Sequence, residues 1–390
     1  MKGARTEKEK APMVRRVSGA GRAACARKAS AGNACEPARP AFAGKCLAPP
    51  RTAFAGRRLF VGAACLLVVF AALVAAAGAD YAVRILTGIA INIVLAEALN
   101  LFNGFTGLFS LGHVGFMAIG AYASSILSLP LAAKAATMPD LPSWLGSVQL
   151  PFLPAILCGA AIATVLAFLV GIPLMRLSGP YVSVATMGFL VITQVILANW
   201  DSLTRGARTF SGVPAYTNLA NSWLWAAFAV YLALRIKRSS FGRSMLASRD
   251  DAIAARSIGI DILRSRLLAF CLSAFLTAAG GGLWAHFIGA FSPKSFYFPQ
   301  TFSIITMVVI GGLGSVRGSV LGVVSVTVVS EILRNAERGF DLGLFRIPPM
   351  YGASQVVMAV LLMLVIVYRP KGMLGESEMK IRSGSPHQDR

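Results

Sequence analysis

Apolar residues occur in long blocks along the chain, and short polar segments separate these blocks. The blocks lie at about 59–79, 83–102, a stretch ending near 129, 152–172, a stretch ending near 199, 221–236, 266–290, 300–312, 317–333 and 350–368. A helix needs about 20 mainly apolar residues to cross the hydrocarbon core of a membrane. The pattern therefore predicts an all-α, polytopic integral membrane protein with about ten transmembrane helices.

Composition agrees with this prediction. Hydrophobic residues make up 56% of the 390 residues, the mean hydropathy is +0.68, and only 14% of residues are charged. Soluble domains carry roughly a quarter charged residues.

The positive charge is concentrated at the N-terminal end of the chain. The formal net charge is +21, but residues 1–58 alone hold fourteen Lys and Arg residues against three Glu. We expect residues 1–57 to be a disordered, basic cytoplasmic tail, because a segment so rich in Ala, Arg, Gly and Pro cannot bury an apolar core. The charge is therefore no sign of nucleic-acid binding. Residues 58–370 are the predicted transmembrane domain.

The remaining basic residues indicate the orientation in the membrane, because Lys and Arg are enriched in cytoplasmic loops. Between Lys237 and Arg264 there are six Lys and Arg residues. The loops predicted on the other side hold the same number spread over four segments, at 130–149, 200–220, 291–299 and 335–349. This difference in density places residues 237–265, the tail 371–390 and both termini in the cytoplasm.

Residues 237–265, here called the central loop, are too long and too charged for a simple connection. No Gly or Pro occurs from Met245 to Ile258, and Met245, Ala252, Ala255 and Ile258 recur at helical spacing, so we expect one short amphipathic helix that ends at Gly259. Two interpretations stay open from the spacing. The helix docks a partner, or the loop only fixes the topology.

A Gly- and Asn-rich stretch runs from Asn100 to Tyr122 and predicts a broken or closely packed membrane helix. Ionisable residues inside spans are candidates for a transport pathway. The predicted pathway residues are Glu97, Asn100, Asn103, Gly104, Gly107, Gly112 and His113. For Glu97 the alternative is a carboxyl group hydrogen-bonded between helices, and for His113 it is packing around the break.

Enzyme chemistry is not indicated by the sequence. The chain has no G-x-x-x-x-G-K-[ST] motif, so no ATP hydrolysis by a P-loop is expected. We find no Ser/His/Asp set, and the six Cys include no C-x-x-C pair. We therefore expect no catalytic residues, no metal site and no cofactor.

Several short motifs occur in a specific order between about residues 80 and 375. They are Asn100-Leu-Phe-Asn-Gly104 with Ser110-Leu-Gly-His113, Arg176-Leu-Ser-Gly-Pro-Tyr181, Asn199-Trp200, Phe241-Gly-Arg243, Ala254-Ala255-Arg256-x-x-Gly259-Ile260, Gly311-Gly312-Leu313-Gly314 and Arg369-Pro370-x-Gly372. In this order they resemble LivM-type permeases, the membrane subunits of branched-chain amino acid ABC importers. Residues 1–57 lie outside the resemblance.

The resemblance implies an inner-membrane assembly. Its members would be a homologous LivH-type permease, two ATP-binding subunits, an external solute-binding protein and an amino-acid substrate. It also implies that the central loop is a cytoplasmic coupling loop that docks an ATP-binding subunit. The residues to which this role transfers are Arg249, Asp250, Asp251, Ala254, Ala255, Arg256 and Gly259. Among them we expect Arg249 to lie on the solvated side of the docking helix.

This chain departs from the general ABC-permease pattern at Ile253, where a Glu usually precedes the two alanines. In the loop after Trp200, Arg205 and Arg208 replace part of a Gly-rich run, and we favour solvation for them over contact with a binding protein. Two other functions stay open. One is a related permease for urea or another small amide, and the other is an ion-coupled secondary transporter that uses Glu97 or His113.

Overall fold

A computed structural model describes residues 80–139, 141–177, 179–337, 352–368 and 372–373. The predicted tail 1–57, the predicted first span 59–79 and nearly all of the predicted tail 371–390 lie outside the described residues.

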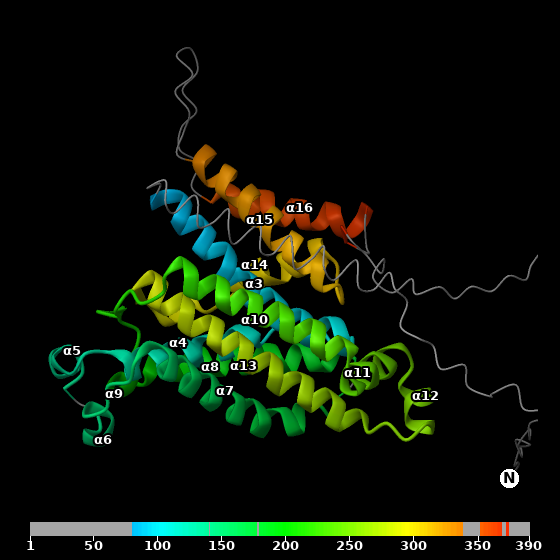
Figure 1. The fold of residues 1–390 in the computed structure, drawn as a ribbon, viewed down its shortest axis with the longest axis horizontal. Coiled ribbons are helices and arrows are strands. Elements are labelled where there is room, and N and C mark those ends of the chain that lie inside the picture. The colour runs from blue at the N-terminus through cyan, green and yellow to red at the C-terminus, as the bar shows by residue number, and fades with distance from the viewer. Residues whose placement is uncertain (1–79, 140, 178, 338–351, 369–371, 374–390) are drawn as a thin grey trace, which may run out of the picture. The chain divides into compact units, whose positions relative to one another are not determined.

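Each predicted apolar block from residue 83 onward corresponds to a helix (Figure 1). These helices are α3 (Asp80–Thr106), α4 (His113–Ser128), α7 (Phe152–Leu174), α8 (Pro180–Asn199), α10 (Leu219–Arg238), α13 (Ile262–Ile288), α14 (Phe298–Gly311), α15 (Val316–Glu337) and α16 (Ala353–Tyr368). Among the described residues, six helices are long and apolar enough to cross a membrane. The helices α4, α14 and α16 are shorter, at 14 to 16 residues.

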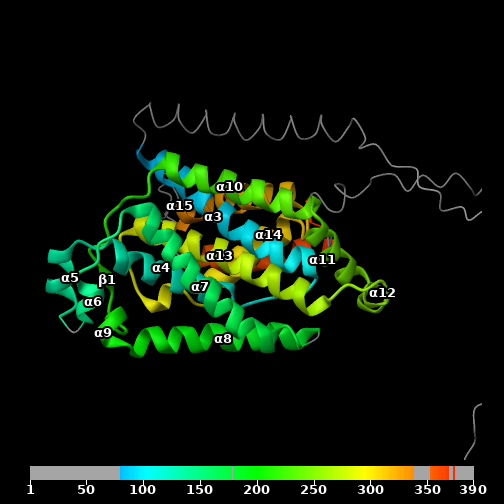
Figure 2. The same cartoon turned by 60° about the horizontal axis from the view of Figure 1, so that its bottom comes forward.

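Small elements lie at the two ends of the helix bundle. The helices α5 (Leu131–Thr137), α6 (Ser143–Gly146) and α9 (Asp201–Thr204) lie at one end, and α11 (Ser240–Asp250) and α12 (Ala252–Ser257) lie at the opposite end (Figures 1 and 2). A two-stranded antiparallel ladder joins β1 (Phe210–Ser211) to β2 (Ala290–Phe291), and the 3-10 turn η1 (Pro293–Ser295) follows.

Two basic side chains at the α5–α6–α9 end are held by their own loops. Lys134 is 2% exposed and donates to the carbonyl oxygens of Leu145 and Val148. Burial lowers the pKa of Lys134 from its ordinary value. Arg205 donates to Thr209 O at 3.3 Å, so this arginine bonds within its loop.

The centre of the bundle is helix α13, which packs against α3, α4 and α7. Small residues allow this close packing, because membrane helices gain contact where side chains are absent. A Cβ atom on Gly120 would overlap the backbone of Ala278, and one on Gly281 would overlap the backbone of Met117. The outward sides of α7 and α8 expose large apolar residues such as Val165, at 60%, and Val184, at 69%, as lipid-facing surfaces do.

The central loop contains two helices rather than one, so the prediction of a continuous helix over residues 245–258 is wrong. Asp251 has an extended backbone with φ of −151°, and it separates α11 from α12. Its carboxylate accepts from Ile253 N at 2.8 Å and from Ala254 N at 3.0 Å. An Asp in this position satisfies the free N–H groups of the next helix, and helix propensity gave way to that capping preference.

Candidate functional site

The predicted break in the membrane helix is present between α3 and α4. Residues 107–112, here called the first break, connect the two helices without helical structure. Side chains bind the backbone of this segment. Ser110 N donates to Asn103 Oδ1 at 3.0 Å, Leu111 N donates to Thr186 Oγ1 at 3.1 Å, and Ser183 Oγ donates to Phe109 O at 2.6 Å. The break is therefore built by polar side chains of α3 and α8.

A second interruption lies between α14 and α15. Residues 312–315, here called the second break, form a tight turn in which Ser315 N donates to Gly312 O at 3.2 Å. The side chain of Asn100, fully buried in α3, binds this turn with both ends of its amide. Asn100 Oδ1 accepts from Gly314 N at 2.8 Å, and Asn100 Nδ2 donates to Ser315 O at 3.2 Å.

Gly104 lets α3 and the second break approach each other. A Cβ atom on Gly104 would lie 2.5 Å from Gly314 N, a distance that real Cβ contacts do not reach. Gly314 itself has φ of +82°, in the left-handed region that favours glycine. The motif Asn100-Leu-Phe-Asn-Gly104 thus serves both breaks, since Asn100 and Gly104 hold the second and Asn103 holds the first.

His113 begins α4 and is 4% exposed. Its Nδ1 lies 2.8 Å from Ser110 Oγ, and its ring packs against Phe102 and Phe270 with centroid distances of 5.4 and 5.8 Å. Among the described residues, His113 Nε2 has no hydrogen-bond partner. The predicted packing of His113 around the break is therefore present, and one of its nitrogen atoms remains available.

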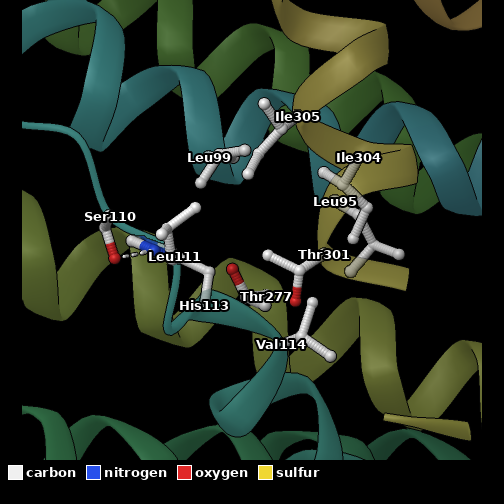
Figure 3. Close-up of a pocket in the computed structure, with 10 residues that line it drawn as sticks. All are labelled: Leu95, Leu99, Ser110, Leu111, His113, Val114, Thr277, Thr301, Ile304 and Ile305. Atoms are coloured by element: carbon white, nitrogen blue, oxygen red, sulfur yellow. Dashed lines mark hydrogen bonds between the residues drawn. The ribbon is translucent and has the colours of Figure 1, made fainter. Parts of the chain in front are cut away.

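A small pocket, here called the constriction, lies beside the first break (Figure 3). Aliphatic side chains and hydroxyl groups both line it, and they come from α3, the first break, α4, α13 and α14. The lining residues are Leu95, Leu99, Ser110, Leu111, His113, Val114, Thr277, Thr301, Ile304 and Ile305. In the described part of the chain, no group of three or more His, Cys, Asp and Glu is arranged to hold a metal ion.

Glu97 is 1% exposed and accepts a hydrogen bond from Ser319 of α15. This contact corresponds to the alternative in which a carboxyl group joins two helices. Glu97 is not among the residues that line the constriction.

The helix α12 presents an unexpected surface. Ile253 is 78% exposed and Ile258 is 74% exposed, whereas Ala255 is only 2% exposed. Ala254 and Gly259 are exposed as well, and Gly259 has open space around it and φ of +84°. The helix α12 thus turns Ala255 towards its own chain, and contact of Ala255 with a partner stays a prediction.

Arg249 also differs from the expectation that it is solvated. It is half-buried at the end of α11, and its Nη1 donates to Gly104 O at 2.6 Å. The i+4 spacing from Met245, which is also buried, was the available sequence signal that Arg249 shares the inward side of α11.

Residues 81–367 match the protein family described as "Branched-chain amino acid transport system / permease component". The chain belongs to this family. The predicted resemblance to LivM-type permeases is thereby confirmed, and the permease is a multi-pass membrane protein.

The permease is similar to LivM, the high-affinity branched-chain amino acid transport system permease protein, of two bacteria. It is 27% identical to LivM of Escherichia coli (strain K12), over 76% of this chain and 71% of that protein. It is 29% identical to LivM of Salmonella typhimurium, over 77% of this chain and 72% of that protein. It is also 27% identical to LivH of Salmonella typhimurium, over 71% and 89%. No solved structure matches the permease.

In the permease, the predicted pathway residues have two different positions. Of the seven, His113 lines the constriction, whereas Asn100, Asn103 and Gly104 hold the two breaks in place. Gly107 turns the chain into the first break with φ of +71°, and Gly112 packs against Thr186 of α8. Sequence reasoning missed the lining residues of α13 and α14, since a Thr or Ile within an apolar block carries no signal of its own.

Proposed function

We propose that this permease carries branched-chain amino acids across the inner membrane as one subunit of an ATP-driven importer. The family description and the names of the LivM and LivH relatives support this substrate class. The complete importer would contain a LivH-type permease, two ATP-binding subunits and an external solute-binding protein. The basic central loop would lie in the cytoplasm together with both termini.

The constriction beside the first break is the observation that carries the proposal. Its wall is largely aliphatic, from Leu95, Leu99, Ile304 and Ile305, and suits a branched apolar side chain. Hydroxyl groups such as that of Thr301 and the non-helical backbone of the first break offer polar partners for the charged ends of an amino acid. Transport would widen this constriction by moving α14 relative to α3.

The exposed surface of α12 would dock the ATP-binding subunit. Ile253 and Ile258 provide apolar contact area, Ala254 and Gly259 allow close approach, and Arg256 supplies a charge. Contiguous exposed apolar surface is typical of interaction sites, and Ile253 and Ile258 would form part of such a surface. Asp251 caps α12, and the adjacent acidic residue Asp250 is exposed at the end of α11.

The test is uptake of labelled leucine into liposomes that contain the complete importer, with ATP on the side of the ATP-binding subunits. Uptake should require ATP. Replacing Leu99 by Trp should fill the constriction and reduce uptake about tenfold or more while the complex still co-purifies, since each factor of ten corresponds to about 1.4 kcal/mol in the barrier. The matched control is Leu157→Trp, because Leu157 is 42% exposed on α7.

A second arm of this experiment uses Gly259→Arg. The arginine adds volume at the proposed docking surface, so the ATP-binding subunits should no longer co-purify and uptake should be lost. Leucine uptake that persists without ATP, or that is indifferent to Gly259→Arg, would restore the ion-coupled secondary transporter. ATP-driven uptake of labelled urea in place of leucine would favour the small-amide permease.

A further inference from the structure

Arg249 lies in a slot formed by three glycines. Its Nη1 donates to Gly104 O at 2.6 Å. Cβ atoms placed on the other two glycines would meet the same side chain, at 2.7 Å from Cγ for Gly107 and at 2.9 Å from Nη1 for Gly314. One side chain of the central loop is thereby fitted between the end of α3, the start of the first break and the second break.

The hydrogen bond made by Arg249 satisfies a group that helix geometry leaves open. Gly104 lies within the last turn of α3, which ends at Thr106, and the last four carbonyl groups of a helix lack partners within the helix. A positive charge at this end also interacts favourably with the helix dipole. Arg249 therefore supplies a hydrogen bond that the last turn of α3 lacks, at the helix end where the first break begins.

Lys237 provides a second cation at the same place. It lies in the last turn of α10, where the central loop starts, and its Nζ donates to Gly314 O at 2.7 Å. The central loop thus binds one carbonyl group of α3 and one of the second break through two basic residues. Asn100 also joins α3 to the second break directly, through its hydrogen bonds with Gly314 N and Ser315 O.

The position of Arg249 in the sequence connects this contact to α12. Only Asp250 separates it from Asp251, the residue that caps α12. Two residues therefore join the start of α12 to a side chain that lies between both breaks.

We propose that Arg249 is a positioning residue that passes movement of the central loop to the two breaks. This inference rests on the proposed function, in which α12 docks an ATP-binding subunit. Loss of the guanidinium group leaves α12 and its exposed surface intact, but removes the link between that surface and the constriction. Hydrolysis of ATP then continues while transport falls.

The experiment compares Arg249→Ala with Arg249→Lys in the complete reconstituted importer. The matched control is Arg243→Ala, because Arg243 is exposed on the same helix and donates to Arg238 O within its own loop. Co-purification, ATP hydrolysis and leucine uptake are measured on the same preparations. Arg249→Ala should keep co-purification and hydrolysis, and the number of leucine molecules transported per ATP should fall about tenfold. Arg249→Lys should recover part of this ratio, and Arg243→Ala should leave it unchanged.

A second readout follows the second break itself. Leu313 is 41% exposed in the turn, so a cysteine placed there, in a chain whose six native cysteines are replaced by alanine, reports the rate of thiol labelling. Addition of ATP should change this rate with Arg249 present and should leave it unchanged with Arg249→Ala. If Arg249→Ala does not accumulate in the membrane, Arg249→Lys decides by the same two measurements, with a reduced ratio supporting the proposal and a wild-type ratio overturning it.

An unchanged transport ratio, an unchanged response of the Leu313 position or a loss of co-purification in Arg249→Ala would overturn the inference and leave the proposed function standing. Absence of ATP-driven leucine uptake in the wild-type importer would instead overturn the proposed function and the inference together.

Discussion

The two breaks in the membrane helices differ in where their polar partners come from. In the first break, the partners are Asn103 of α3 and the hydroxyl groups of Ser183 and Thr186 on α8. In the second break, they are Asn100 of α3 and Lys237 at the start of the central loop. Backbone groups within a membrane must find partners inside the protein, so these side chains decide where each break lies.

The difference shows that each break is held by the element that supplies its hydrogen-bond partners, so movement of that element should move the break. The first break is fixed to α8, whose outer surface is apolar and exposed, and the central loop reaches it through the side chain of Arg249, which lies against Gly107. The second break is fixed to the central loop through Lys237. We therefore expect changes at α8 to act through the first break, and changes at Lys237 to act through the second break.

The largest effect is expected from Gly112→Leu at the contact between the first break and α8. A Cβ atom on Gly112 would overlap the backbone carbonyl group of Thr186, which cannot move away as a side chain would. Overpacking of this kind costs about 1–3 kcal/mol, so thermal unfolding in detergent should shift downward and leucine uptake should fall. The control is Gly188→Leu on α8, where nothing lies within 4 Å. Equal unfolding temperatures and equal uptake in Gly112→Leu and Gly188→Leu would contradict the close contact between Gly112 and Thr186.

An effect of similar size is expected from replacing the two asparagines of α3 by leucine. Asn100→Leu leaves Gly314 N and Ser315 O without their partner, whereas Asn103→Leu leaves only Ser110 N. Each unpaired buried group costs about 1–3 kcal/mol, so Asn100→Leu should destabilise the protein more. Thermal unfolding measures both variants beside Asn199→Leu, whose amide is exposed and donates to Val195 O one turn earlier in its own helix. If Asn103→Leu destabilised the protein more than Asn100→Leu, the hydrogen bond to the first break would contribute more to stability than the two bonds to the second break.

The sequence predicts the helices and the first break, but it does not predict the contacts between distant segments. The apolar blocks give the helices because length and apolar composition decide what crosses a membrane. The Gly and Asn pattern of residues 100–122 also gives the first break. The partner of Asn100 could not be predicted, since Gly314 lies 214 residues further along the chain and only folding brings them together.

The central loop was harder to predict for a local reason. Good helix formers from Met245 to Ile258 favoured one helix, but the capping carboxylate of Asp251 divides it into two. The division rotates α12 relative to α11, so Ala255 turns inward and Ile253 outward. A single misplaced helix start thus changes which side chains the central loop exposes.

The smallest effects are expected at single partners of each break. Thr186→Val removes a hydroxyl group that is fully buried and accepts from Leu111 N, which should cost about 1 kcal/mol. Lys237→Met removes a half-buried ammonium group that solvent reaches, so less than about 1 kcal/mol should be lost. Unfolding measured at low and high salt separates them, because only the contribution of Lys237 should weaken with salt. If the loss of stability in Thr186→Val also depended on salt, Thr186 would not act through a neutral, buried hydrogen bond as described.

The separation of Asn100 from its partner also has a consequence for biosynthesis. The 214 residues between Asn100 and Gly314 take about 10–40 s to synthesise at about 5–20 residues per second. Throughout that interval α3 is already made, but the turn that its amide group binds does not yet exist. The nascent chain therefore carries an incompletely bonded asparagine until about four fifths of its 390 residues have been translated, and closure of the second break reports that synthesis has passed α14.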